Sequence, residues 1–317
     1  MPIKNRFSEL LPEITEWRRD IHENPELLFE THRTSSFVEN SLKEFGCDDV
    51  TSGIGRTGVV GVIKGRTNKS GKVIALRADM DALPIFEATK LDYKSKIPGI
   101  MHACGHDGHT AMLLGAAKYL SETRNFDGTV VVIFQPAEEG GGGGREMCED
   151  GMMERWGVDE VFGMHNWPGA PAGSFSIRSG VFFAATDTFE INLVGRGGHA
   201  AQPQETVDTT VLASHLVLAL QTIASRNADP TDQIVVSVTS IESESKAFNV
   251  IPEHVTLKGT IRTMSPEMRD LAEKRLKEIS KSVSETFGGS CEVDFRPGYP
   301  AMVNHKEQTC LLYTSPS

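Results

Sequence analysis

The sequence is poor in basic side chains and has no long apolar run. It has 32 Lys and Arg residues and 43 Asp and Glu residues, which give a formal net charge of −11. This acidic balance argues against nucleic acid or an anionic membrane surface as the main partner. No run reaches the ~18 apolar residues of a membrane-spanning helix, and the N-terminus has no apolar core of a secretory signal. We therefore expect a protein that binds neither nucleic acid nor membranes.

Cysteine is scarce and scattered. The chain has five cysteines, and none of them forms a CxxC pair. An odd, dispersed set of thiols is typical of a reducing compartment. This pattern predicts a cytoplasmic protein.

Two glycine-rich segments lack the features of phosphate-binding loops. GIGRTG at 53–58 matches GxGxxG, but a strand pattern follows it where that motif requires a helix. We expect a hairpin turn there. The glycine run at 140–144 lacks a Gly-Lys-Ser/Thr ending, so it is not a P-loop and is expected to be a flexible loop.

The sequence does contain an alternation of apolar strands and amphipathic helices. Residues 12–46 look helical, 72–81 and 128–139 read as strands, and 108–122 has the apolar face of a helix. The nearly continuous apolar run 128–139 is expected of a strand buried on both faces. This order predicts an α/β domain with a mixed, largely parallel sheet between helices.

The pattern changes at about residue 184. From 185 to 295 the order is strand, helix, strand, strand, helix, strand, which fits an α+β fold of the ferredoxin type. We therefore predict a first domain at 1–184, a second at 185–295, and the start of a return to the first domain at 296–317.

The stretch MHACGHDGHT at 101–110 carries the densest group of reactive side chains. Cys104 and His106 flank Gly105, which permits a tight turn, and residues two apart converge where the backbone turns. A thiolate and an imidazole suit zinc or another divalent transition metal. Hydrogen-bonded loop histidines, or a Cys/His nucleophile pair, are the alternatives that these residues leave open.

Two further groups of candidate residues stand at strand ends. Glu138 and Glu139 close the strand at 128–139, and adjacent carboxylates point to opposite sides of a strand. One could bind a metal while the other acts as a general base, although a solvated pair of charges is the alternative. His165 ends another strand, and a lone histidine there is usually a hydrogen-bonded structural residue.

Asp79 and Asp81 stand at the end of a third strand. Either carboxylate could orient a metal-binding histidine, and capping of the following turn is the alternative. Open α/β sheets bind ligands outside the carboxyl ends of their strands. Four polar groups at such ends therefore favour one common site.

The second domain contributes three candidates. His199 lies in a glycine-rich loop, and Asn249 and Arg262 follow in the next strand region. Arg262 could clamp a substrate carboxylate with two hydrogen bonds. An ordinary surface arginine on a strand is the alternative.

Together these motifs resemble the aminoacylase-type metalloamidohydrolases, a group that includes hippurate hydrolases, indole-acetyl-amino-acid hydrolases and N-acyl-amino-acid deacylases. The resemblance implies a zinc-peptidase-like catalytic domain with two divalent ions, manganese or zinc, and an inserted lid domain through which homodimers form. It also implies hydrolysis of N-acyl amino acids to a carboxylic acid and an amino acid. The segments that carry it, between about residues 14 and 305, are RRDIHENPELLFE, ALRADMDALPI, MHACGHDGHTAMLLGAA, FQPAEEGGGG, GMHNWP, GRGGHAAQP and NVIP.

The resemblance also implies a role for each candidate residue. Glu138 matches the general base, and His199 matches the lid histidine that stabilises the oxyanion. Asp79 and Asp81 match the family's motif ALRADMDALPI, where they would support the metal ligands. The metal ligands implied are Cys104, His106, Glu139 and His165, and the substrate-binding residues implied are Asn249 and Arg262.

The C-terminal end departs from the resemblance. The family's last metal-binding histidine lies beyond residue 317, and the tail from about 309, TCLLYTSPS, does not resemble the family. We therefore expect a truncated chain. The alternative function is an inactive fragment or binding module that keeps a partial metal site.

Overall fold

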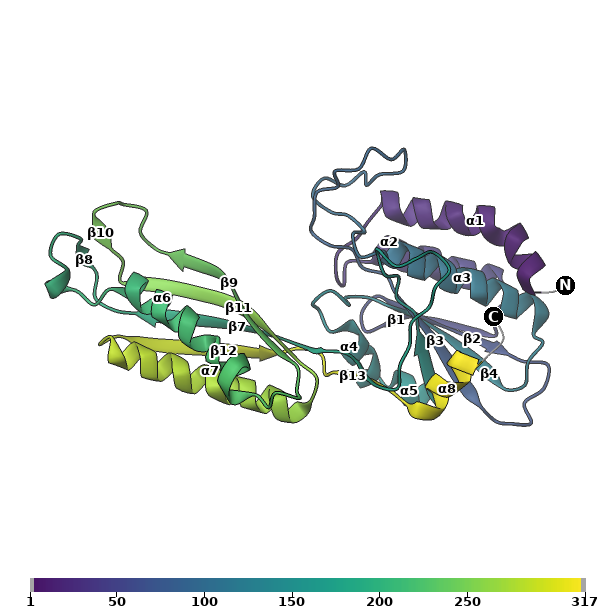
Figure 1. The fold of residues 1–317 in the computed structure, drawn as a ribbon. Coiled ribbons are helices and arrows are strands. Elements are labelled where there is room, and N and C mark those ends of the chain that lie inside the picture. The colour runs from purple at the N-terminus through teal and green to yellow at the C-terminus, as the bar shows by residue number, and fades with distance from the viewer. Residues whose placement is uncertain (1–2, 315–317) are drawn as a thin grey trace. The chain divides into compact units, whose positions relative to one another are not determined.

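The structure is a computed structural model that describes residues 3–314. The chain divides into two compact units, Met1–Pro171 and Ala172–Ser317 (Figure 1). The domain limits expected from the sequence stay a prediction, and residues 315–317 of the expected tail lie outside the described residues. Within residues 3–314, no helix combines the length and the apolar character needed to cross a membrane.

The first unit is built on a five-stranded sheet with the strand order β1-β2-β4-β3-β5. β3 pairs in parallel with both β4 and β5, whereas β1 with β2 and β2 with β4 are antiparallel. The predicted α/β class with a mixed sheet is confirmed, and its parallel part is limited to three strands. The strands are β1 (Asp49–Ile54), β2 (Gly58–Lys64), β3 (Val73–Asp79), β4 (Thr129–Gln135) and β5 (Glu160–Gly163).

The predicted hairpin turn explains the antiparallel part of this sheet. Residues 55–57 connect β1 to β2, and both Gly55 and Arg56 have positive φ angles, of 57° and 72°. A short turn of this kind reverses the chain, so β1 and β2 must pair antiparallel. β2 then lies beside β4, with Val59 opposite Phe134.

Helices cover both faces of the sheet. On one face, Val132 and Phe134 of β4 pack with α2 and α3 in a core of fully buried side chains. On the other face, Val131 and Ile133 pack against the short helices α4 and α5. Burial on both sides is why the strand reads as a continuous apolar run. The helices are α1 (Ile3–Glu23), α2 (His32–Glu44), α3 (His106–Thr123), α4 (Gly143–Glu149) and α5 (Met152–Trp156).

The second unit contains a four-stranded antiparallel sheet, ordered β12-β7-β11-β9, with α6 and α7 packed on it. Its chain order β7-α6-β9-β11-α7-β12 is the one that the sequence pattern predicts for a ferredoxin-type fold. Asp208 and Ser265 cap the two helices by accepting hydrogen bonds from backbone amides of the first turn. The elements are β7 (Ala185–Val194), α6 (Thr209–Leu220), β9 (Ile234–Ser243), β11 (His254–Thr263), α7 (Pro266–Thr286) and β12 (Ser290–Pro297).

Smaller elements complete the second unit. β8 pairs with β10, and β6 pairs with β13, each in a two-stranded antiparallel sheet. Their bounds, with those of the remaining helices, are β6 (Gly180–Phe183), β8 (Gly198–His199), η1 (Pro203–Glu205), η2 (Ile223–Asn227), β10 (Val250–Ile251), β13 (Met302–Asn304) and α8 (Lys306–Thr314).

Candidate metal centre

The predicted site residues of the first unit gather at one edge of the sheet. β3, β4 and β5 run parallel, so their carboxyl ends meet at the same edge. β3 ends at Asp79, the segment after β4 carries Glu138, and the segment after β5 carries His165. α3 begins at this edge with His106, which completes the group.

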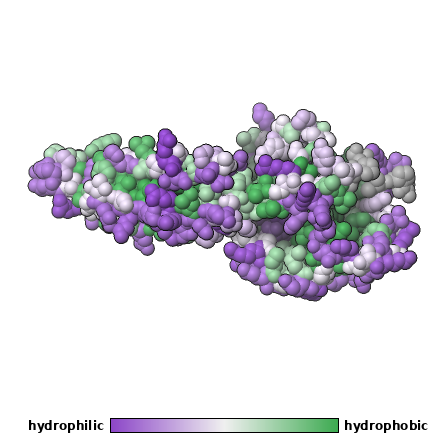
Figure 2. Space-filling model, turned by 60° about the horizontal axis from the view of Figure 1, so that its bottom comes forward, coloured by the Kyte–Doolittle hydropathy of each residue, from purple (hydrophilic) through white to green (hydrophobic). Residues whose placement is uncertain are grey.

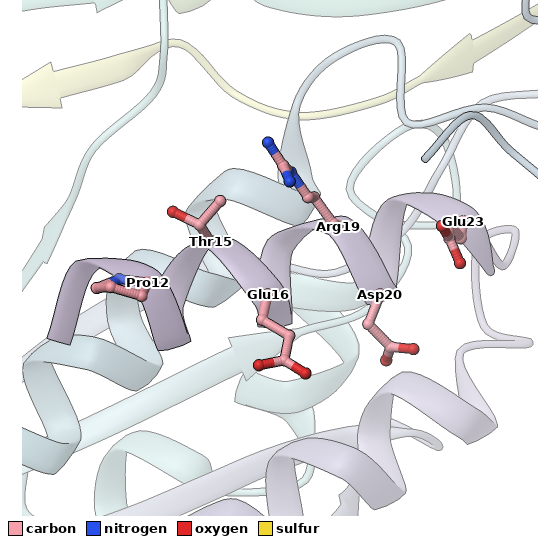
Figure 3. A pocket seen from close by; sticks show the side chains of 6 residues that line it. All are labelled: Pro12, Thr15, Glu16, Arg19, Asp20 and Glu23. Carbon is pink, nitrogen blue, oxygen red and sulfur yellow. The ribbon is translucent and has the colours of Figure 1, made fainter. Parts of the chain in front are cut away.

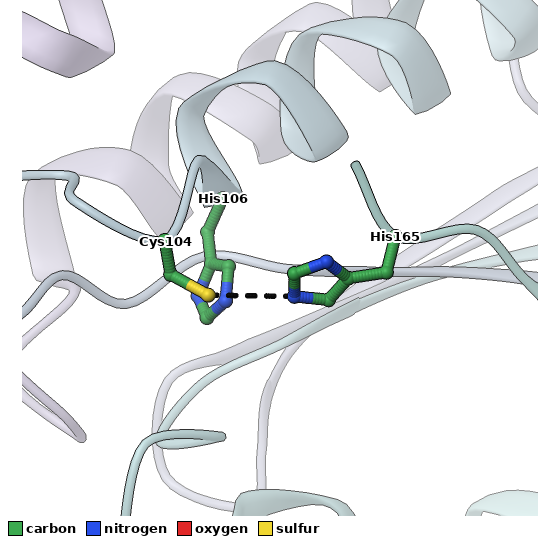
Figure 4. Close-up of side chains that lie close together, drawn as sticks. All are labelled: Cys104, His106 and His165. Carbon is green, nitrogen blue, oxygen red and sulfur yellow. Dashed lines mark hydrogen bonds between the residues drawn. The ribbon is translucent and has the colours of Figure 1, made fainter. Parts of the chain in front are cut away.

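Cys104, His106 and His165 lie close together, as Figure 4 shows. The Cys104 Sγ atom is 3.4 Å from Nε2 of His165. On another side, His106 Nε2 lies 3.8 Å from a Glu139 oxygen and 4.0 Å from a Glu138 oxygen. His106 therefore stands between a thiol–imidazole pair and a pair of carboxylates.

The donor atoms of this cluster fit a divalent metal. Both ring nitrogens of His106 and Oε1 of Glu139 are buried without a hydrogen-bond partner among the described residues. Buried polar atoms are rarely left unpaired, because their desolvation costs free energy that nothing returns. Thiolate, imidazole and carboxylate donors are the set that zinc and neighbouring transition metals prefer.

The electrostatics of the cluster point the same way. Burial lowers the pKa of His106, but Asp81, Cys104 and Asp79 outweigh it and raise that pKa to about 11. A ring that holds a proton so firmly lies in a negative field, which a divalent cation would neutralise. Burial lowers the pKa of His165, which favours the neutral imidazole that binds metals.

The pKa of the Glu138 carboxyl group is raised. Burial raises the pKa of its carboxyl group, and the nearby charge of Asp79 raises it further, while Arg77 opposes both. A carboxylate with a raised pKa accepts protons more readily near neutral pH.

Asp79 is a buried connector beside the cluster. One of its oxygens lies 2.6 Å from Nδ1 of His109, and the other accepts a 2.7 Å hydrogen bond from Arg77. His109 Nε2 in turn accepts a 3.0 Å hydrogen bond from the backbone amide of Asn166, beside His165. Asp79 thus links the end of β3 to the segment that carries His165.

Asp81 holds both glutamates through their backbone. Its two carboxylate oxygens accept 3.0 Å hydrogen bonds from the amides of Glu138 and Glu139, and one oxygen lies 3.4 Å from Nδ1 of His106. The chain bends just before these amides, where Ala137 is held at a φ angle of 50°. Asp81 therefore contacts three of the candidate site residues, Glu138, Glu139 and His106.

Gly105 is required at the turn between the thiol and the imidazole. Its φ angle is 97°, and a Cβ atom there would lie 2.8 Å from the side chain of Asn166. A larger residue would be strained and would collide with Asn166. The glycine lets Cys104 and His106 both face the cluster.

The candidates of the second unit do not form one group. His199 and Asn249 are neighbours: His199 pairs with Val250, and the amide of Ala200 donates to the Asn249 carbonyl at 3.0 Å. β11 begins at His254, a few residues after Asn249, and Arg262 lies near its other end. At the usual rise of a strand, the eight residues from His254 to Arg262 span a distance on the order of 25 Å.

A separate open depression runs along α1 (Figure 3). Its lining comes from α1 alone and includes none of the site residues described above. The residues that line it are Pro12, Thr15, Glu16, Arg19, Asp20 and Glu23.

Comparison with known proteins gives close matches. A model of peptidase family M20/M25/M40 matches residues 75–314. A hippurate hydrolase of Campylobacter jejuni is 44% identical, covering 94% of this chain and 77% of that protein. An N-acyl-L-amino acid amidohydrolase of Geobacillus stearothermophilus is 40% identical, covering 96% and 81%. The crystal structure of Bacillus subtilis YXEP, described as a dinuclear metal-binding peptidase, superposes with a TM-score of 0.78 at 34% identity, covering 96% and 78%.

Proposed function

Because this chain belongs to peptidase family M20/M25/M40, we propose that it hydrolyses the amide bond of N-acyl amino acids, with hippurate-like or indole-acetyl conjugates as substrates. The products are a carboxylic acid and an amino acid. The observation that carries this proposal is the buried His106, whose ring nitrogens face a thiol and carboxylates beside Glu138. The names of the hippurate and N-acyl amino acid hydrolases among its relatives support the substrate class.

The residues that would hold two divalent ions, manganese or zinc, follow from the donor set. They are Cys104, His106, Glu139 and His165, whose ligand atoms fall into overlapping groups within 4.8 Å. When bound, the ions supply Lewis acidity that activates water and polarises the amide carbonyl. In this assignment Cys104 serves as a ligand and not as a nucleophile.

Glu138 moves the proton. Its carboxylate accepts a proton from the attacking water, and the same oxygen then donates it to the leaving amine nitrogen. Asp81 keeps Glu138 in position through the backbone amide, so the carboxylate need not reorganise during the reaction. The raised pKa of Glu138 suits both the acceptance and the return of the proton.

We further propose that His199 stabilises the oxyanion, and that Asn249 and Arg262 bind the substrate. One small substrate cannot reach both His199 and Arg262 of the same chain, because His199 pairs with β10, just before the start of β11, whereas Arg262 lies near the other end of β11. A homodimer resolves this, since a second copy then supplies His199 and Asn249.

The second unit has a surface suited to such a dimer. β9 is an edge strand of ten residues, and its Val235 and Ile241 are 53% and 59% exposed. A long edge strand with exposed apolar side chains readily pairs with another chain. Leu218 on α6 is also exposed, and Figure 2 shows apolar (green) side chains at the surface among hydrophilic ones.

A complementation experiment tests the dimer. Glu138→Gln and His199→Ala each disable every site of their own homodimer. When the two variants are refolded together in equal amounts, half of the dimers should contain one copy of each. Each mixed dimer would hold one complete site out of two. Activity should therefore return to about a quarter of wild type. Light scattering should give twice the 34.6 kDa chain mass. A monomer, or mixing without recovery, would contradict the proposal.

The substrate class is tested by product release. Metal-loaded protein should liberate glycine and benzoate in equal amounts from N-benzoylglycine, measured by amine labelling and chromatography. Blocking the substrate carboxylate as an amide should raise KM about tenfold or more, because it removes the charge that Arg262 binds. The proposal fails if metal-loaded protein releases no amino acid from a panel of acetyl, benzoyl and indole-acetyl amino acids.

A further inference from the structure

The end of α1 and the segment that follows it, residues 22–30, contact the chain beside Asp81, Glu138 and His106. The Glu26 carbonyl accepts a 2.8 Å hydrogen bond from the amide of Ala82, next to Asp81. The Leu28 carbonyl accepts a 3.2 Å hydrogen bond from the amide of Ala137, next to Glu138. This segment belongs to the motif RRDIHENPELLFE, to which neither the sequence nor the proposed function gives a role.

His22 makes the third contact of this segment, with the start of α3. Its side chain is 6% exposed, and Nδ1 lies 2.9 Å from Oδ2 of Asp107, the residue after His106. Arg18 donates to the same oxygen at 3.2 Å. Two side chains of α1 thus contact one buried carboxylate in the first turn of α3.

The other side of the His22 ring faces Glu87. Nε2 lies 3.3 Å from Oε1 of Glu87, whose second oxygen accepts a 2.6 Å hydrogen bond from the amide of Ser95. Only a doubly protonated ring can donate to two carboxylates. Consistent with this, hydrogen bonding to Asp107 raises the pKa of His22, opposed by burial and assisted by Glu87.

We propose that His22 is a positioning residue for the metal centre, which fixes the first turn of α3 through Asp107 and thereby sets the direction of the His106 ring. The inference rests on the proposed function insofar as His106 is taken as a metal ligand. Asp107 and His106 are consecutive, so anchoring one side chain restrains the backbone from which the other extends. Mutation of a residue that orients a metal ligand typically lowers metal affinity about 10–100-fold.

Two amide variants separate the two sides of the ring. The side-chain nitrogen of Asn takes nearly the place of Nδ1, and that of Gln nearly the place of Nε2. His22→Asn therefore keeps the bond to Asp107, whereas His22→Gln keeps only the one to Glu87. The matched control is His32→Gln, because His32 begins α2 and its side chain is 71% exposed.

The measurement is Co²⁺ titration of the metal-free protein, followed by the absorption of the cobalt–thiolate bond that Cys104 would form. We expect His22→Gln to lose about 10–100-fold in Co²⁺ affinity. His22→Asn and His32→Gln should stay within about threefold of wild type. Circular dichroism establishes that each variant is folded at the titration temperature.

Each result decides between defined outcomes. Wild-type affinity in His22→Gln, or equal losses in both His22 variants, would overturn the positioning role. A wild-type protein that binds no Co²⁺ would instead overturn the proposed function. Should His22→Gln fail to fold, Glu87→Gln gives the complementary comparison: it leaves the Asp107 contact intact, so a tenfold loss of Co²⁺ affinity there would refute the inference.

Discussion

Replacing Glu138 by Gln is expected to lower kcat by about 10²–10⁴-fold while leaving metal binding unchanged. The amide keeps the size of the carboxylate and its backbone bond to Asp81, but it cannot accept a proton. Turnover of N-benzoylglycine gives kcat, and elemental analysis gives the metal content of the same preparation.

The neighbouring glutamate supplies a matched control. Glu139→Gln makes the same chemical change one residue away, yet it should lower both activity and metal content, since Glu139 is the proposed ligand. The assignment of roles would be refuted if Glu138→Gln kept wild-type turnover, or if the metal loss followed Glu138 and not Glu139.

Local pattern was enough to predict which side chains of the first unit gather at one edge of the sheet. Glu139 and His165 follow strand ends, and Cys104 precedes a helix start, at boundaries that hydrophobic periodicity marks. Because parallel strands end at a common edge, convergence followed once the α/β class was assigned. The resemblance then attached a role to each residue.

The supporting contacts could not be predicted, because they join distant segments. Asp81 binds the amides of Glu138 and Glu139 across 57 and 58 residues, and His22 reaches Asp107 across 85. No period or spacing in the sequence encodes which buried carboxylate faces which amide. Strand order is equally non-local, which is why a largely parallel sheet was expected although β2 lies antiparallel beside β4.

The sequence carries a local signal for the break between α1 and α2. The segment 12–46 was expected to be helical throughout, but α1 ends at Glu23 and α2 begins at His32. The Asn24–Pro25 dipeptide marks this break, because proline removes a helix hydrogen bond and disfavours helix at the residue before it. That break separates α1, which carries His22, from the segment whose Glu26 and Leu28 carbonyls bind the amides of Ala82 and Ala137.

Removing bound metal with a chelator is expected to lower activity by a factor on the order of 10³ or more, since Lewis acidity contributes several kcal/mol to such a reaction. Dialysis followed by separate additions of Mn²⁺, Zn²⁺ and Co²⁺ should restore activity with at least one of them. Unchanged turnover after metal has been reduced to trace levels would contradict a metal-dependent mechanism.

Labelling of the cysteines before and after metal removal tests whether Cys104 binds the metal. Cys104 is partly exposed and lies 3.4 Å from His165, so a bound metal should shield its sulfur from a thiol reagent. Cys148 and Cys310 are exposed and serve as internal controls within the same chain. We expect metal removal to increase labelling at Cys104 alone, as mapped by peptide mass spectrometry. Equal labelling of Cys104 with and without metal would mean that its thiol is not a ligand, and the metal would then have to be held by His106 and the carboxylates.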